Sequence, residues 1–109
     1  MADLTVQEIT EAGLNPVFVA ASAGGDTFTN TGREVVHVKN GSAAAIDVTL
    51  VGANPCEFGF THNDVVSVPA AGERIIDPTP TRRYVDKTTK KTTINYSAVT
   101  SITVAVYQK

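Results

Sequence analysis

Residues 24–41 constrain the fold of this chain more than any other stretch, because they combine two turns with a β-branched strand. The glycine and Asx residues at both ends of the stretch suit positive φ angles and turns closed by side-chain-to-backbone hydrogen bonds. Between them, Val36 and Val38 alternate with His37 and Lys39, as in a strand with one buried face. The stretch predicts an all-β fold and an exposed or interfacial position for His37.

The same period of two recurs along the rest of the chain. In one segment Ile46, Val48 and Leu50 fall on one face, which indicates a strand that forms a hairpin or meander with its neighbour. We expect about eight short antiparallel strands at regular spacing and no convincing helix, a pattern typical of a β-sandwich. Besides the strand around Val36 and Val38, the expected strands are residues 16–21, 46–51, 65–68, 73–76, 92–97 and 102–107, with a further start at 84–85.

Length and composition limit the chain to one ordered domain. A chain of 109 residues builds a single core, and 42% hydrophobic with 18% charged residues is typical of a folded protein. Asn15 and Pro16 interrupt the pattern, so we expect a sandwich domain over residues 15–109, preceded by residues 1–14. The leading segment is either an arm that adds as a strand to a neighbour or an edge strand of its own subunit.

Two connections between the expected strands carry unusual residues. The loop over residues 52–64 contains Phe58 and Phe60, and we expect it to fold back over an open end of the core. Pro78 and Pro80 lack the backbone donor that a strand ladder needs, so they predict a corner where the chain changes sheets.

No residue pattern predicts catalysis, a cofactor or a metal site. His62, Asp64 and Glu57 contain metal-binding side chains, but their spacing matches neither a closed zinc site nor a calcium loop. Cys56 is the single cysteine, so the chain forms no internal disulfide, and it is a nucleophile only if a histidine approaches it. We therefore expect a protein that is not an enzyme, made in the cytoplasm without a signal peptide or membrane span.

Several turn and strand segments resemble a group of small virion proteins of tailed bacteriophages, the capsid decoration (cement) and minor head structural proteins. The resemblance rests on residues 24–28, 38–42, 68–74 and 95–97 and on the apolar last strand. It implies a jelly-roll-like module on the exterior of the assembled capsid, bound to the major capsid protein, often as a homotrimer at three-fold positions, after synthesis in the host bacterial cytoplasm. The chain departs from the family in residues 82–91, which are more basic.

Two other functions stay open. A carbohydrate-binding module uses the same kind of scaffold, although the chain has no Trp and offers only three Tyr residues as sugar platforms. A head-tail connector or tail component differs from a decoration protein in assembly symmetry, which the sequence does not reveal.

The basic segment stands out because the chain as a whole carries a net charge of −2, whereas residues 82–91 carry a local net charge of +4. One interpretation is a solvated hairpin whose lysines block unwanted strand pairing, and another is docking onto an acidic capsid surface. Nucleic acid is a poor partner because no aromatic platform is interleaved with these charges. The candidate contact residues for the capsid or a neighbouring copy are Leu4, Val6, Ile9, Arg82, Arg83, Lys87, Lys90 and Lys91.

Overall fold

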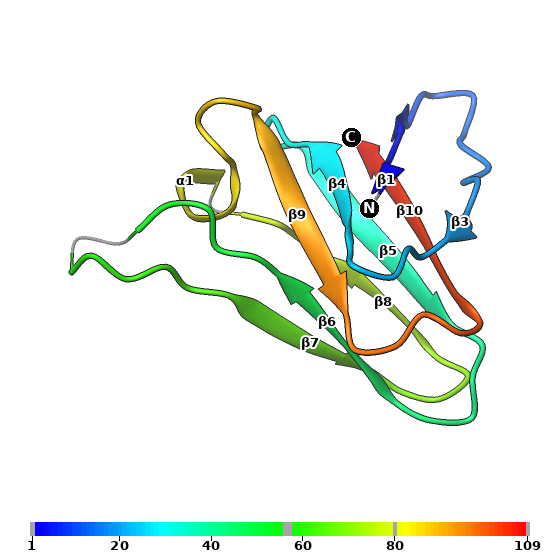
Figure 1. The fold of residues 1–109 in the computed structure, drawn as a ribbon. Helices are drawn as coiled ribbons and strands as arrows, with labels where there is room; N and C mark the ends of the chain where they lie inside the picture. The colour runs from blue at the N-terminus through cyan, green and yellow to red at the C-terminus, as the bar shows by residue number, and fades with distance from the viewer. Residues whose placement is uncertain (1, 56–57, 80, 109) are drawn as a thin grey trace.

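The computed structural model describes residues 2–55, 58–79 and 81–108, which form ten β-strands and one short helix (Figure 1). None of these residues belongs to a helix long and apolar enough to cross a membrane. The elements are β1 (Ala2–Asp3), β2 (Val6–Glu8), β3 (Val19–Ala20), β4 (Asp26–Thr29), β5 (Glu34–Asn40), β6 (Ile46–Leu50), β7 (Asp64–Val68), β8 (Glu73–Ile76), α1 (Thr81–Tyr84), β9 (Lys91–Tyr96) and β10 (Ile102–Gln108).

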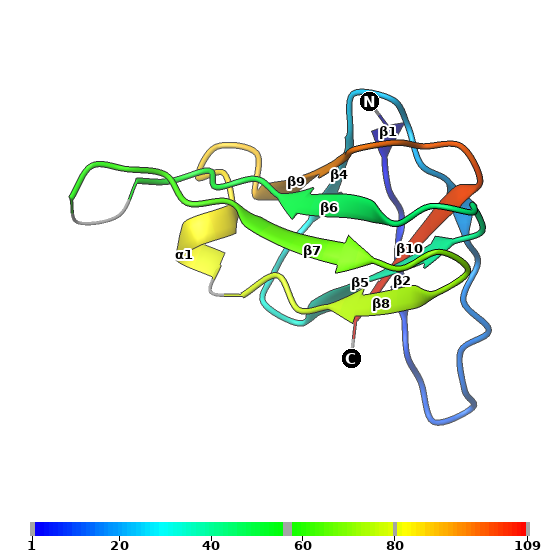
Figure 2. The same cartoon turned by 90° about the horizontal axis from the view of Figure 1, so that it is seen from below.

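The strands form two sheets that stack as the layers of a sandwich (Figure 2). The first sheet has the order β1-β4-β9-β6-β7, and the second has the order β2-β10-β5-β8, with β3 also paired to β10. If β1 and β2 are left out, the eight strands from β3 onward are all antiparallel and follow the order of a jelly roll. The expected fold class is therefore confirmed, and the two N-terminal strands are additions to it.

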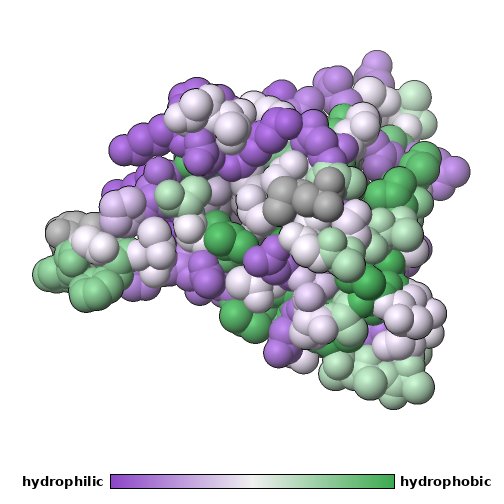
Figure 3. All heavy atoms as spheres, in the orientation of Figure 1, coloured by the Kyte–Doolittle hydropathy of each residue, from purple (hydrophilic) through white to green (hydrophobic). Residues whose placement is uncertain are grey.

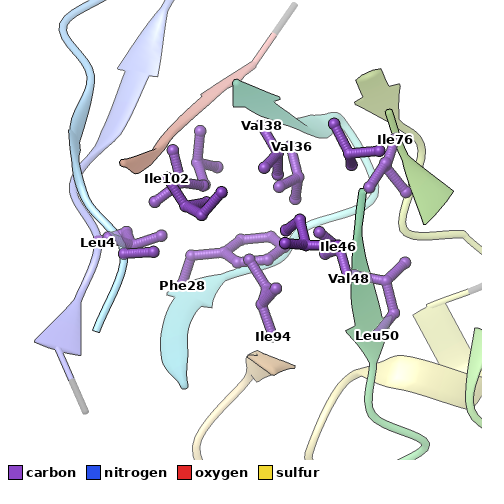
Figure 4. Close-up of a cluster of buried hydrophobic side chains, with 14 of the residues drawn as sticks. Leu4, Phe28, Val36, Val38, Ile46, Val48, Leu50, Ile76, Ile94 and Ile102 are labelled. Carbon is purple, nitrogen blue, oxygen red and sulfur yellow. The ribbon is translucent and has the colours of Figure 1, made fainter. Parts of the chain in front are cut away.

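Apolar side chains from both sheets meet between the layers, as their alternation in the sequence predicts. Phe28 of β4 lies in the middle of this cluster and is fully buried (Figure 4). Burying a side chain of this size stabilises the fold by roughly 1.5–3 kcal/mol. The fully or nearly fully buried aliphatic partners are Val36, Val38, Val48, Leu50, Val68, Ile94, Ile102, Val104 and Val106.

The N-terminal segment bridges the two sheets. β1 pairs in parallel with β4 of one sheet, and β2 pairs in parallel with β10 of the other. Between them, Leu4 is only 8% exposed and joins the core cluster, while its backbone N–H donates to the carbonyl of Thr27. Of the two alternatives for this segment, the structure shows pairing at the sheet edges of its own subunit. Leu4 packs into the core of the same chain.

Two local expectations are wrong. Residues 84–85 do not begin a strand, because Tyr84 ends α1 and its side chain is buried in the core cluster. The connection between β6 and β7 does not fold back over the core but reaches away from both sheets (Figure 1). As a result, Phe58 is 77% exposed and Phe60 is 67% exposed.

Candidate functional site

An open cleft of about 700 Å³ lies at the end of the sandwich that carries α1. Its walls come from three parts of the chain: the turn after β4, the connection between β6 and β7, and the segment that runs from α1 to β9. The lining residues are Asn30, Thr31, Asn54, Pro55, His62, Thr81, Arg82, Arg83, Val85, Lys87 and Lys90. We call this concavity the basic cleft.

Asn54 fixes α1 against the base of the β6–β7 connection. Its side-chain amide donates to the carbonyl oxygens of Arg82 and Val85 at 2.8 and 2.6 Å. The backbone N–H groups of Ala53 and Asn54 donate to the carbonyl of Arg83. The last carbonyls of a helix have no partner within the helix, so these donors satisfy groups that would otherwise need water. The clamp holds the backbone that carries two cationic side chains.

The loop after α1 is closed by Asp86. Its carboxylate accepts hydrogen bonds from the backbone N–H groups of Thr88 and Thr89 at 2.8 and 3.0 Å. These bonds favour the charged form and hold the pKa of Asp86 below its usual range. Lys90, which has a positive φ of 62°, donates its backbone N–H to the carbonyl of Asp86. Lys87 and Lys90 therefore belong to a turn whose backbone is held by hydrogen bonds.

The opposite wall is built by Asn30 and Thr31. Asn30 is buried, and its amide donates to the carbonyl of Pro78 and to the hydroxyl of Thr92. Beside it, the buried carboxylate of Glu34 accepts hydrogen bonds from the backbone and hydroxyl groups of Thr31. The Glu34 carboxylate stabilises the turn next to the cleft, but Glu34 is not one of the residues that line the cleft.

The electrostatic character of the basic cleft follows from its lining. Four exposed cationic residues line it, and none of its described lining residues is an Asp or Glu. Among the described residues, Lys91 forms an ion pair with Asp3 and His37 lies within hydrogen-bond distance of Glu73, so neither contact uses the cleft's cations. Lys91 is different from the other basic candidates, because its ammonium lies 2.8 Å from the Asp3 carboxylate.

The exposed tip next to the cleft is apolar. Residues of apolar hydropathy lie at the far left of Figure 3, where the β6–β7 connection reaches farthest from the sheets. Below the tip, Gly52 donates its backbone N–H to the side chain of Asn63, and the backbone of His62 lies too close to Gly52 for any Cβ. The base of the connection is therefore tightly closed while Phe58 and Phe60 stand in solvent. We call these two phenylalanines the aromatic tip.

The structure thus brings together four of the eight contact candidates and adds residues that the sequence did not single out. Arg82, Arg83, Lys87 and Lys90 share the basic cleft, whereas Lys91 pairs with Asp3. None of Leu4, Val6 and Ile9 lines the cleft, and of these only Ile9 has an exposed side chain, at 42%. Asn30 and Asn54 are the additions, because their roles depend on contacts between distant segments. Phe58 and Phe60, which the sequence predicts to cover the core, instead form the exposed aromatic tip.

The expectation for His37 is also wrong, since its side chain is buried on the outer face of the second sheet. Its Nε2 lies 3.2 Å from the carboxylate of Glu73 and its Nδ1 lies 3.2 Å from the hydroxyl of Tyr107. The ring of Phe18 covers it edge to face, with centroids 4.9 Å apart. His37 is a packed structural residue because the segment before β3 folds over this face.

No group of three metal-binding side chains occurs among residues 2–55, 58–79 and 81–108. Cys56 and Glu57, on which the reactive-thiol and metal interpretations depend, lie outside the described residues.

Comparison of the chain with protein-family models, with curated proteins and with solved structures finds no match in any of the three.

Proposed function

We propose that this protein is a virion structural protein of a tailed bacteriophage that binds the outer surface of the assembled capsid and stabilises it. Two features support the proposal: the resemblance of the turn segments to decoration and minor head proteins, and the jelly-roll strand order. Its partner is the major capsid protein, and its location is the exterior of the virion.

The observation that carries the proposal is the aromatic tip. Two large apolar side chains, 77% and 67% exposed, stand on one connection that reaches away from the sandwich. Removing such side chains from water is favourable by roughly 1.5–3 kcal/mol each. Neither side chain is buried within its own chain. A pocket on the surface of another protein could bury both of them. Many copies on one shell multiply a modest contact into firm attachment.

Self-association belongs to the same proposal. The strands β7 and β8 are the edges of their sheets and pair on one side only within the described residues. An unpaired edge is stabilised when a second copy covers it. The trimeric state is what the family resemblance implies. Sedimentation of the purified protein over a range of concentrations tests it. A monomer at all concentrations and on the shell would contradict it.

The test uses undecorated capsids assembled from the major capsid protein of the same phage. Wild-type protein should co-sediment with these shells and raise the temperature at which they disassemble. The double variant Phe58→Ala with Phe60→Ala should bind at least about tenfold more weakly, the loss expected when about 1.4 kcal/mol of contact free energy is removed. Because both side chains are exposed, its far-ultraviolet spectrum and melting temperature should match wild type.

Val17→Ala with Val19→Ala is the matched control, since it removes two other exposed apolar side chains. It should bind shells as wild type does. Binding of the aromatic-tip variant at wild-type strength, or failure of the wild-type protein to bind any form of the shell, would overturn the proposal.

A further inference from the structure

We propose that the basic cleft is a binding site for an acidic polypeptide segment, which it holds through several carboxylates at once. This inference rests on the proposed function in one respect only, namely that the ligand is part of a partner protein.

The first argument is charge. Arg82, Arg83, Lys87 and Lys90 bring four positive charges to one cleft, although the chain as a whole carries a net charge of −2. Like charges held close together repel one another, and a ligand of opposite charge relieves that repulsion. Among the described lining residues none is acidic, so none of them offsets this charge.

The second argument is the state of the nearest carboxylates. Glu34, next to the Asn30 wall, accepts hydrogen bonds from the backbone of Thr31 and Arg33 and from the hydroxyl of Thr31. Asp86, on the other wall, is engaged by two backbone N–H groups of its own loop. Both carboxylates hold turns, and among the described residues neither forms an ion pair with a cleft cation, although the charge of Asp86 attracts Lys90.

The third argument is geometry. The cations are spread over α1 and the following loop and border about 700 Å³, so a single small anion would reach only some of them. An extended segment with several Asp or Glu side chains can meet guanidinium and ammonium groups in succession. The four cationic side chains of the lining disfavour an apolar ligand, and its described residues include no Phe, Tyr or Trp ring on which a nucleobase could stack.

The fourth argument is rigidity. Asn54 clamps the carbonyls of Arg82 and Val85, and the Asp86 turn fixes the backbone of Lys90. A site whose backbone is already ordered loses less conformational freedom when a ligand binds. The cleft is thus prepared for a ligand, and the aromatic tip on the same connection as Asn54 offers a second contact to the same partner.

The test uses the full chain without any capsid. The probe is a blocked hexapeptide of aspartate, and its binding is measured by calorimetry at low salt. We expect saturable binding with one site per chain, which weakens steeply as salt is raised. Arg82→Gln with Arg83→Gln, and separately Lys87→Gln with Lys90→Gln, should each weaken the affinity at least about tenfold, because each removes two charge-assisted contacts.

Lys39→Gln with Arg74→Gln is the control of equal charge. These two exposed residues lie at the ends of β5 and β8 that are remote from the cleft, and Val38 of β5 pairs with Arg74. This variant should bind the peptide within about twofold of wild type. A hexapeptide of asparagine should not bind to any of the proteins.

Several results would overturn the inference. They are equal weakening by the cleft and control variants, tighter binding of inorganic phosphate or single-stranded DNA than of the acidic peptide, and no peptide binding at low salt. Peptide binding by a protein that does not bind capsids would leave this inference standing and overturn the proposed function. Capsid binding by a protein that does not bind the acidic peptide would overturn this inference and leave the proposed function standing.

Discussion

At the residue scale, Asn54 connects two parts of the basic cleft that are far apart in the sequence. Asn54→Ala removes both side-chain hydrogen bonds, which are donated to the carbonyl oxygens of Arg82 and Val85. We expect the free energy of unfolding to fall by about 1–2 kcal/mol, the usual cost of losing such bonds where water can partly replace them. Urea unfolding measures the change. Asn15→Ala, at an exposed position outside the strands, should change it by less than about 0.5 kcal/mol.

Tyr96 makes the stability of the protein fall at high pH. Its hydroxyl donates to the carboxylate of buried Asp26 at 2.8 Å. Burial, followed by this hydrogen bond and the charge of Asp26, raises the pKa of Tyr96 well above its ordinary value of 10.0. The unfolded chain loses this proton above about pH 10, whereas the folded protein keeps it, so the stabilisation is full below that pH and is lost above it.

We therefore expect the free energy of unfolding of wild type to fall above pH 10 more steeply than that of Tyr96→Phe, by up to about 1.4 kcal/mol per pH unit. Denaturant unfolding of both proteins between pH 7 and pH 11 provides the comparison. Parallel pH dependences of the two proteins would show that Tyr96 ionises equally easily in the folded and unfolded states.

At the scale of elements, the N-terminal strands contribute to the core rather than only to its edge. Leu4 lies in the cluster between the sheets, whereas Ile9 is 42% exposed. Leu4→Ala should lower the free energy of unfolding by about 2–3 kcal/mol, near the low end for buried leucines because the site is peripheral. Ile9→Ala should lower it by less than about 0.5 kcal/mol. Similar costs for both substitutions in thermal unfolding would contradict the burial of Leu4.

The main strands could be predicted from the sequence because their alternation directly reports which face is buried. Ile46, Val48 and Leu50 face the core in β6, as their spacing predicts. The helix α1 could not be predicted, since four residues are too few to show a helical period and its end is capped by Asn54 from another segment. The course of the β6–β7 connection was also unpredictable, because apolar residues in a loop do not reveal whether they face a core or a partner.

The candidate site could be predicted only in part for the same reason. The run of basic residues in 82–91 is visible in the sequence, and four of its members line the cleft. The cleft itself exists because Asn30, Asn54 and His62 approach that run from distant parts of the chain. Such proximity depends on the paired sheets and has no local signal.

At the scale of the whole molecule, the aliphatic core should hold the fold without any bound ion or covalent link. Its buried cluster contains Phe28 and Tyr84 among aliphatic side chains. We expect a far-ultraviolet spectrum dominated by β-structure and a melting temperature that changes by less than about 1 °C with a chelator or a reductant, since neither removes core contacts. Unfolding on addition of a chelator would show that a metal ion contributes to the fold.

The position of β10 also decides when this protein can fold during its synthesis. β10 is the last strand in sequence, yet it lies inside its sheet, between β5 on one side and β2 and β3 on the other. β2 and β3 leave the ribosome early, but the strand with which both pair is β10, which emerges last. Pairing across almost the whole chain is slow because a long loop must close first. The second sheet is therefore completed only after translation of residue 108, and until then its half-formed edges are open to neighbouring nascent chains.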